Sequence, residues 1–166
     1  MLFRSVDSLF QLSPRVSLSL EGGATVYQFD HNGTVARTPD QTSYYGAVSV
    51  RHKPSELFSQ TLRAGRDLQL GITSDVLELW AVRYQADVRI TQYTSMTPRL
   101  FYEHGEELKT AGAERFNRFG VGVTFTRQLS EHLRAGLGYN FTLKDSDLAG
   151  RSYKQNGVVL DVTYRF

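Results

Sequence analysis

The stretch "LRAGLGYNFTLK" at residues 133–144 alternates between apolar and polar or small residues without a break. The apolar members have odd numbers and are Leu133, Ala135, Leu137, Tyr139, Phe141 and Leu143. The polar or small members have even numbers and are Arg134, Gly136, Gly138, Asn140, Thr142 and Lys144. Because successive side chains of a β-strand point to opposite sides, this pattern predicts a strand with one apolar and one polar face.

The same period of two runs through most of the chain, and helical periodicity is hard to find. We expect strands near 2–12, 15–28, 42–52, 57–70, 78–91, 98–104, 115–128, 132–144 and 153–166. The segments 42–52 and 98–104 alternate less cleanly than the others. Most of the strands reach the length of about 9–11 residues that a tilted strand needs to cross a bilayer.

Short and long connections alternate along the chain. The short ones lie at 12–15, 52–56, 93–98 and 128–132, and the longer polar ones at 30–41, 70–77, 104–114 and 144–152. All the short connections therefore lie at one end of the structure. This arrangement predicts an all-β fold, an up-and-down antiparallel barrel with eight to ten strands in this chain, as a single domain over residues 1–166 or as the C-terminal part of a larger barrel.

Composition excludes several classes of function. The chain has 19 basic and 17 acidic residues, and their even spread gives no support for a nucleic-acid surface. The absence of cysteine excludes disulfides, thiolate metal sites and cysteine nucleophiles. No run of consecutive apolar residues approaches the length that a transmembrane helix needs. The start "MLFRSVDSLFQLSPR" lacks the uninterrupted apolar core of a signal peptide. The chain is therefore a soluble protein, a mature secreted product or a piece of something longer.

Two architectures share this alternation. A soluble lipocalin-like barrel turns its apolar face inward, whereas a membrane barrel turns it outward to lipid. The apolar faces carry aromatic residues near strand ends, which suits the aromatic girdles of a membrane barrel; they are Phe119, Phe125, Tyr139, Phe141, Tyr164 and Phe166. The polar faces are rich in glycine, threonine and arginine, as in a confined polar lumen. We therefore favour the transmembrane barrel.

This facing predicts which charged residues line the lumen. They are Arg63, Asp67, Arg83, Asp87, Arg89, Arg134, Asp161 and Arg165. Such a set tunes the selectivity of a wide channel, or forms a salt-bridged plug in a narrow barrel. Arg66 falls on the apolar side near the long loops, and we expect it to extend into the lipid headgroup zone.

Three stretches carry a resemblance to a known family. They are "QLSPRVSLSL", "FGVGVTFTRQLSEHLRAGLGYNFTLKDSDLAGRSYKQN" and "VVLDVTYRF". The chain resembles the C-terminal portion of a Gram-negative outer-membrane β-barrel, most closely the β-barrel porin group. It departs from that family in lacking a signal peptide and in its odd strand count, since bacterial single-chain barrels have even counts. Either 2–12 is not a membrane strand, or the chain is the end of a larger barrel.

The resemblance implies a location in the bacterial outer membrane. The implied partners are outer-membrane lipid and the barrel-assembly machinery, with a homo-oligomer as a further arrangement. Alternate residues of the last strand resemble the signal that this machinery reads, namely Val158, Leu160, Val162, Tyr164 and Phe166.

No motif indicates catalysis, a metal or a cofactor. The four histidines, His31, His52, His104 and His132, have no metal-like spacing, and we place them in connectors and loops. The acidic run "DSD" at 145–147 is better explained as a solvated loop than as a cation site. We expect a protein without enzymatic activity that allows passive diffusion of small polar solutes. The alternatives are a non-conducting structural or export-associated barrel and, third, a soluble lipocalin-like carrier.

Overall fold

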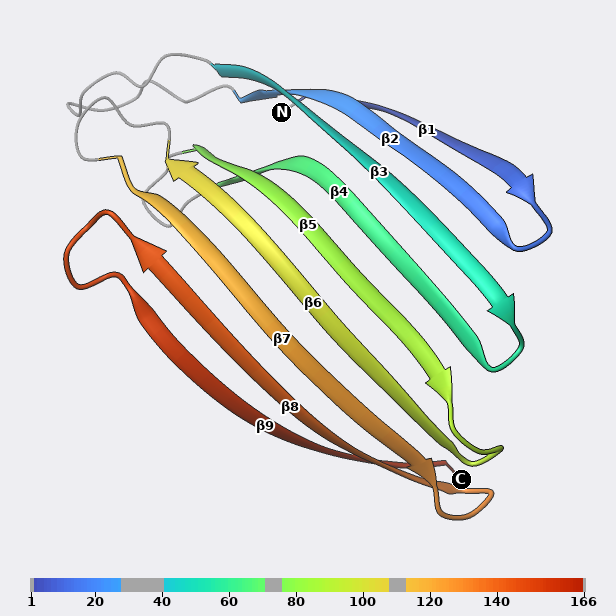
Figure 1. The fold of residues 1–166 in the computed structure, drawn as a ribbon. Coiled ribbons are helices and arrows are strands. Elements are labelled where there is room, and N and C mark those ends of the chain that lie inside the picture. The colour runs from blue at the N-terminus through green and yellow to red at the C-terminus, as the bar shows by residue number, and fades with distance from the viewer. Residues whose placement is uncertain (1, 28–40, 71–75, 108–112, 166) are drawn as a thin grey trace.

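The computed structural model describes residues 2–27, 41–70, 76–107 and 113–165, and these residues form nine strands in one sheet. The strands are β1 (Leu2–Ser13), β2 (Val16–Tyr27), β3 (Gln41–Ser55), β4 (Phe58–Leu70), β5 (Val76–Arg89), β6 (Thr94–Glu107), β7 (Arg115–Gln128), β8 (Leu133–Ser146) and β9 (Tyr153–Tyr164). Each strand pairs antiparallel with the next along the chain, in the order β1 to β9 (Figure 1). The expected all-β, up-and-down meander is confirmed. Among the described residues no helix is long and apolar enough to cross a membrane.

Two strands are longer than the sequence pattern indicated. β3 extends to Ser55, and β6 runs from Thr94 to Glu107, so that His52 and His104 lie within strands and not in a connector or a loop. The alternation of β6 is obscured by Pro98, which has no N–H to donate. The ladder nevertheless continues on both sides of Pro98, because β6 pairs with β7 along its whole length.

The short connections lie at one end of the sheet, as the sequence indicated. They are residues 14–15, 56–57, 90–93 and 129–132. We call this the short-turn end; it lies at the lower right of Figure 1. The opposite, long-loop end carries the connection at 147–152 and Glu114, just before β7; residues 28–40, 71–75 and 108–112 lie outside the described residues.

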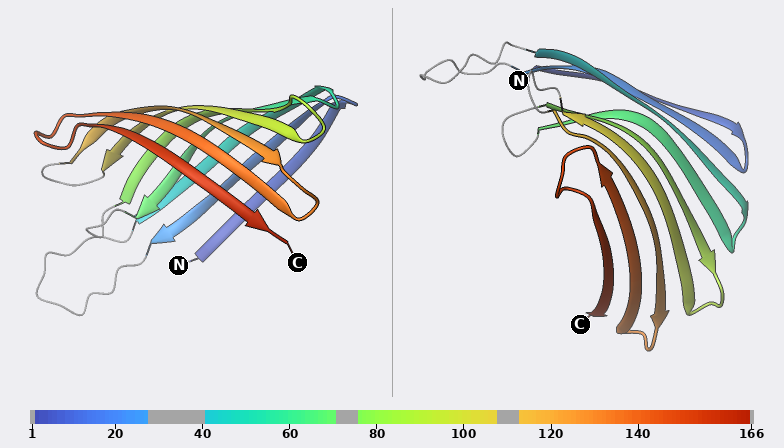
Figure 2. Two further views of the ribbon diagram at one scale, coloured as in Figure 1. Left: turned by 90° about the horizontal axis from the view of Figure 1, so that it is seen from below. Right: turned by 60° about the vertical axis from the view of Figure 1, so that its left-hand side comes forward.

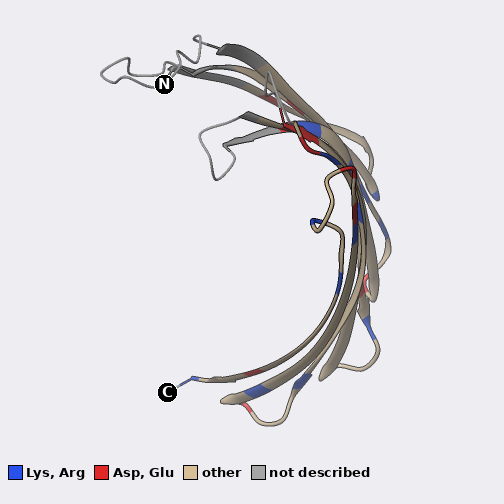
Figure 3. Cartoon of the chain, turned by 90° about the vertical axis from the view of Figure 1, so that its left-hand side faces the viewer, with Lys and Arg blue, Asp and Glu red and all other residues tan. Residues whose placement is uncertain are grey.

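The sheet is a curved, open arc (Figures 2 and 3). β1 pairs with β2 along its length, and β9 pairs with β8, but β1 and β9 are not neighbours in the sheet. Residues 2–12 therefore do form a strand, and this strand is not the partner of the last one. Both β1 and β9 are edge strands of the described sheet.

The two faces of the sheet differ in polarity and in crowding. The polar face contains the strongly buried side chains Ala47, Leu79, Ala81, Phe116 and Glu103. The apolar face contains most of the exposed large hydrophobic side chains, among them Val48, Leu62, Val82, Leu100, Phe119, Phe125, Leu137, Val158, Leu160 and Val162. Side chains converge on the inside of a curved sheet and diverge on its outside, so the polar face is the concave one. Arg66 and Ala86 are the buried exceptions on the apolar face.

Glycines on the polar face make room for aromatic rings of a neighbouring strand. The ring of Phe101 covers Gly120, and the ring of Phe116 covers Gly105, so closely that a Cβ atom at either glycine would collide with the ring. Gly105 of β6 and Gly120 of β7 thus allow large rings to lie flat on the concave side, which supports the interpretation of Gly120 as a small residue of a polar interior.

Candidate functional site

A row of ion pairs crosses the middle of the polar face, from β2 to β7. Its members, which we call the charge ladder, are Glu21, Arg63, Asp67, Arg83, Glu103 and Arg118. The Arg63 Nη2 atom lies 2.8 Å from the Glu21 Oε2 atom. Arg63 and Arg83 are direct cross-strand partners on β4 and β5, so the ladder sets two cations side by side. The acidic residues flank this pair: Glu21 contacts Arg63, and Asp67 and Glu103 contact Arg83.

Glu103 is the hub of the charge ladder. Arg83 donates from Nη2 to one carboxylate oxygen at 2.8 Å, and Arg118 donates from Nε to the other, also at 2.8 Å. The Glu103 side chain is only 5% exposed, whereas those of Arg83 and Arg118 are 42% and 34% exposed. A buried carboxylate is stable only when its oxygens are satisfied, and here two arginines satisfy them.

The structure places the eight sequence-predicted lumen residues along the polar side of the sheet. Arg63, Asp67 and Arg83 meet in the charge ladder, with 3.8 Å between the Arg83 Nη1 and Asp67 Oδ2 atoms. The other five lie nearer the short-turn end, on β5, β8 and β9 or directly after β9; they are Asp87, Arg89, Arg134, Asp161 and Arg165. These five do not join the ladder.

Sequence reasoning missed the hub of the ladder, Glu103, and two further members, Arg118 and Glu21. Glu103 lies in β6, whose alternation Pro98 obscures, and its partner strands become known only from the register. Arg118 shares the parity of Gly120 and Gly122 on β7, so extending that alternation toward the start of the strand was the signal that would have found it. Glu21 was missed although it alternates with the apolar residues of β2.

A second ionic cluster lies at the long-loop end around Glu114, which directly precedes β7. Lys144 Nζ lies 2.7 Å from one carboxylate oxygen, and Arg151 Nη1 lies 2.9 Å from the other. Ser146 also donates its hydroxyl to this carboxylate at 2.6 Å. Burial alone would raise the pKa of Glu114, but the hydrogen bonds from Lys144, Ser146 and Arg151 outweigh it and lower the pKa to about 2.

The Glu114 cluster should lose its stabilising effect in acid. Because the pKa is lowered in the folded state, the cluster stabilises the 147–152 connection above about pH 4.5 and stops doing so as the pH falls toward 2. Hydrogen exchange of the Asp147 amide, which donates to the Arg115 carbonyl at 3.0 Å, reports on this connection. We expect its protection factor to fall by about tenfold from pH 5 to pH 2.

Two variants make that measurement specific. Glu114→Gln should show the low protection already at pH 7 and no further fall in acid. Asp145→Asn removes a neighbouring carboxylate that only accepts one long hydrogen bond, at 3.5 Å from Ser152, and should keep the pH dependence of the original protein. An acid-induced loss of protection that persists in Glu114→Gln would contradict the assignment.

Arg66 lies on the apolar face, and its side chain is directed toward the long-loop end, where we expected a headgroup zone; it contacts Glu78 and Tyr44, each two positions closer to that end than its own register partners. It is 9% exposed and makes a two-pronged contact with Glu78, with distances of 2.8 and 2.6 Å. Its third donor reaches the Tyr44 carbonyl at 3.0 Å, and its guanidinium lies 4.1 Å from the centre of the Tyr44 ring. Trp80 donates to the same Glu78 carboxylate at 3.0 Å. The charge is therefore neutralised within the sheet surface.

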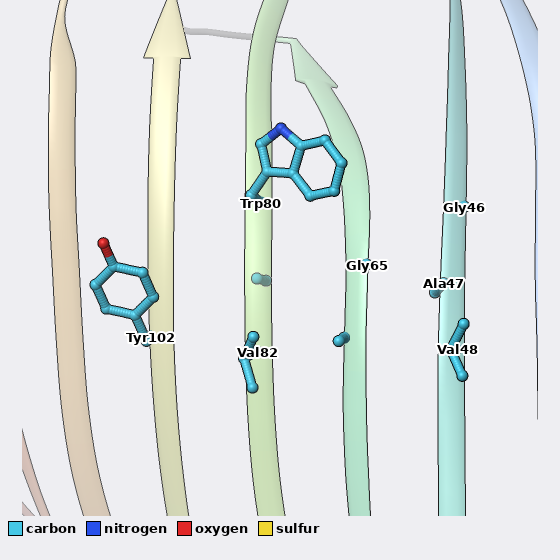
Figure 4. A pocket seen from close by; sticks show the side chains of 9 residues that line it. Gly46, Ala47, Val48, Gly65, Trp80, Val82 and Tyr102 are labelled. Carbon is cyan, nitrogen blue, oxygen red and sulfur yellow. The ribbon is translucent and has the colours of Figure 1, made fainter.

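Beside this ion pair, the apolar face has a shallow hollow of about 300 Å³ (Figure 4). The hollow forms because Gly46 has no side chain and Ala64 a small one, while the larger side chains of Trp80, Val82 and Tyr102 surround it. Its lining is almost entirely apolar. Such a surface is unfavourable in water and suits contact with hydrocarbon.

The histidines and the acidic run have structural partners. His52 contacts Gln60 at 3.1 Å and His104 contacts Asn117 at 2.9 Å, while the ring of His132 lies 6.3 Å from that of Tyr164. The Asp147 carboxylate accepts the Arg115 amide at 2.9 Å. Within the described ranges no group of three or more His, Asp or Glu side chains is arranged to hold a metal ion. His31 lies outside the described residues.

The alternate residues of the last strand share one face, as the sequence indicated. Val158, Leu160, Val162 and Tyr164 are 72%, 73%, 62% and 58% exposed on the apolar face of β9. Their exposure follows from the position of β9 at the edge of the sheet. Phe166, the last residue of the expected assembly signal, lies outside the described residues.

Comparison with solved structures finds the same fold in an outer-membrane protein. OmpT, an in-vitro folded outer membrane protein of Vibrio cholerae, superposes with a TM-score of 0.55 over 96% of this chain, at 14% sequence identity. The match covers 53% of OmpT, so this chain spans about half the length of that protein. No family model and no curated protein match the chain. The fold is thus that of an outer-membrane β-barrel, and the likeness at this identity concerns the fold alone.

Proposed function

We propose that this chain forms part of the wall of a β-barrel in the bacterial outer membrane and that the barrel allows passive diffusion of small polar solutes. The apolar face meets lipid, and the polar face lines the lumen. This orientation is supported by the exposed hydrophobic side chains of the convex side and by the apolar hollow beside Trp80. A lipocalin-like carrier would need the opposite curvature, with the apolar face on the concave side.

The observation that carries the proposal is the open arc of the sheet (Figure 3). A narrow barrel of about eight strands has an interior filled by its own side chains, whereas a wider barrel leaves an aqueous channel. β1 and β9 are unpaired with each other, and because they run in the same direction, direct closure would join them in parallel. We infer that further strands complete the wall and that the barrel is wide enough to conduct.

The charge ladder then lies on the wall of the channel. Its arginines and carboxylates neutralise one another in part, which keeps a hydrated polar surface without leaving buried charges unpaired. Nothing in the ladder resembles a nucleophile with its base, so the proposal includes no catalytic step. Outer-membrane lipid and the barrel-assembly machinery are the proposed partners, the latter through the β9 residues Val158 to Tyr164.

Conductance in planar bilayers tests the function. The purified protein, folded in detergent and shown to be folded by heat-modifiable migration on gels, should insert and give stepwise ion currents. A folded sample that inserts and carries no current would overturn the diffusion pore and favour a non-conducting structural or export-associated barrel. A protein that stays soluble without detergent would overturn the membrane location itself.

A further inference from the structure

Two hollows lie side by side on the polar side of the short-turn end. The first, of about 200 Å³, is lined by Arg89, Ser95, Thr126 and Arg134 among others. The second, of about 180 Å³, is lined in part by Arg134 and Arg165. Arg134 belongs to both hollows, so the three arginines surround one connected region. We call this region the turn-end pocket.

Backbone hydrogen bonds hold the parts of the turn-end pocket together. The Gln128 amide donates to the Tyr93 carbonyl at 2.8 Å, which ties the β5–β6 turn to the end of β7. The Arg165 amide donates to the His132 carbonyl at 2.9 Å, which holds the end of β9 against the β7–β8 turn. Arg165 is thereby placed beside Arg134, on segments whose backbone is fixed.

The three arginines of this pocket lack the partners that the ladder arginines have. In the described part of the chain, Arg89, Arg134 and Arg165 make no ion pair and no side-chain hydrogen bond. Among the described residues, the nearby carboxylates make no ion pair with these arginines: Asp87, two residues before Arg89 on β5, accepts a hydrogen bond from Thr97 at 3.1 Å, and Asp161 on β9 accepts one from Thr163 at 3.2 Å. Glu131 lines the second hollow and is the one acidic residue among its lining residues. The pocket therefore has an excess of positive charge.

The charge distribution along the polar face reinforces this excess. The register places the acidic residues Glu21, Asp67 and Glu103 on the long-loop side of the Arg63–Arg83 pair. On the short-turn side of this face basic residues outnumber acidic ones: Arg51, Arg89, Arg99 and Arg134 lie there with Asp87 and Asp161. Such a separation draws anions toward the short-turn end of the lumen.

We propose that the turn-end pocket binds a small soluble oxyanion, such as a phosphate group, at the mouth of the lumen. Arginine presents a planar fork of N–H donors that matches phosphate oxygens, and Arg89 and Arg134 approach the first hollow from two separate strands. The hydroxyls of Ser95 and Thr126 supply further donors between them. The inference rests on the proposed function for the location of the pocket in a lumen, and it names anions as the substrate class.

Phosphate binding to the folded protein tests the site. The protein is folded in a maltoside detergent, which carries no phosphate, and titrated with inorganic phosphate at constant ionic strength against chloride. The arginine Nε–H signals are followed by NMR. We expect saturable binding, and we expect Arg134→Gln to weaken it by about tenfold because Arg134 lines both hollows.

The matched control is Arg51→Gln. Arg51 lies on the polar face of β3, makes no ion pair among the described residues and lines neither hollow, so the variant removes the same charge elsewhere. It should leave phosphate affinity unchanged. Equal weakening by both variants, or non-saturable binding to the original protein, would mean that the arginines of the turn-end pocket attract phosphate no more than any solvated arginine does. Either result would overturn the proposal.

The same titration separates a soluble anion from a lipid headgroup. Phosphatidylglycerol added to the micelles should not displace phosphate, because the pocket faces the lumen; displacement would overturn the proposal. Binding does not require a current, so the two proposals fail separately. Saturable, Arg134-dependent binding without conductance would uphold the site and overturn the pore, and conductance without such binding would do the reverse.

Discussion

Replacing Val121 by arginine is expected to destabilise the folded protein by about 2–4 kcal/mol. Val121 lies near the middle of β7 on the apolar face, with Leu100 and Phe141 as its partners on the two neighbouring strands. If this face meets lipid, the new guanidinium lies near the bilayer midplane. From there the side chain is too short to reach water at either end of the sheet. The cost is that of removing a charge from water.

The control is Thr124→Arg on the same strand. Thr124 lies on the polar face between Thr97 and Gly138, so its replacement puts the same charge into the proposed lumen. We expect a change within about 1 kcal/mol, because the new side chain stays hydrated. Reversible urea unfolding in lipid vesicles, followed by the fluorescence of Trp80, measures both variants. Equal costs for the two variants would contradict the assignment of the faces.

The sequence was sufficient to predict the strands and their facing because both depend on a local pattern. A one-residue error in β8 would put Arg134 and Lys144 on the apolar face, so the alternation admits one solution. The strand β6 was predicted too short because its interior holds Pro98, and because Phe101 and His104 lie on the faces opposite to those their polarity suggests. Phe101 is accepted on the polar face because Gly120 lies under its ring.

The candidate site was predicted only in part, because ion pairs between strands depend on register. The polarity pattern assigns Arg83 to the polar face, but it does not identify the main partner of Arg83. That partner is Glu103 on the neighbouring strand β6, and not Asp87 on the same strand as Arg83. The pairing of Arg66 with Glu78 was missed for the same reason. These two residues are two positions out of direct register on β4 and β5, a diagonal contact that sequence spacing does not reveal. The open edges of the sheet likewise follow from long-range pairing alone.

Replacing Glu103 by glutamine is expected to destabilise the protein by about 2–3 kcal/mol. Removing one partner of a buried ion pair costs about 3–5 kcal/mol when the remaining charge is fully buried. Arg83 and Arg118 are 42% and 34% exposed, so water compensates in part for the loss and the expected cost is lower. Arg83 would retain only its 3.8 Å contact with Asp67, and Arg118 would lose its carboxylate partner.

Glu106→Gln on the same strand is the matched control for this variant. Glu106 pairs with Arg115 at 2.7 Å, but the two side chains are 38% and 66% exposed, and such a pair contributes about 0–1 kcal/mol. Urea unfolding in vesicles should therefore separate the two variants clearly, although both remove one negative charge from β6.

The same pair of variants also tests whether the charge ladder lines the conduction path of the lumen. Glu103→Gln removes the main carboxylate partner of Arg83 and Arg118 on the channel wall and should shift the reversal potential toward anion permeation, whereas Glu106→Gln, on the apolar face, should leave it unchanged. A reversal potential that both variants alter equally would place the charge ladder outside the conduction path.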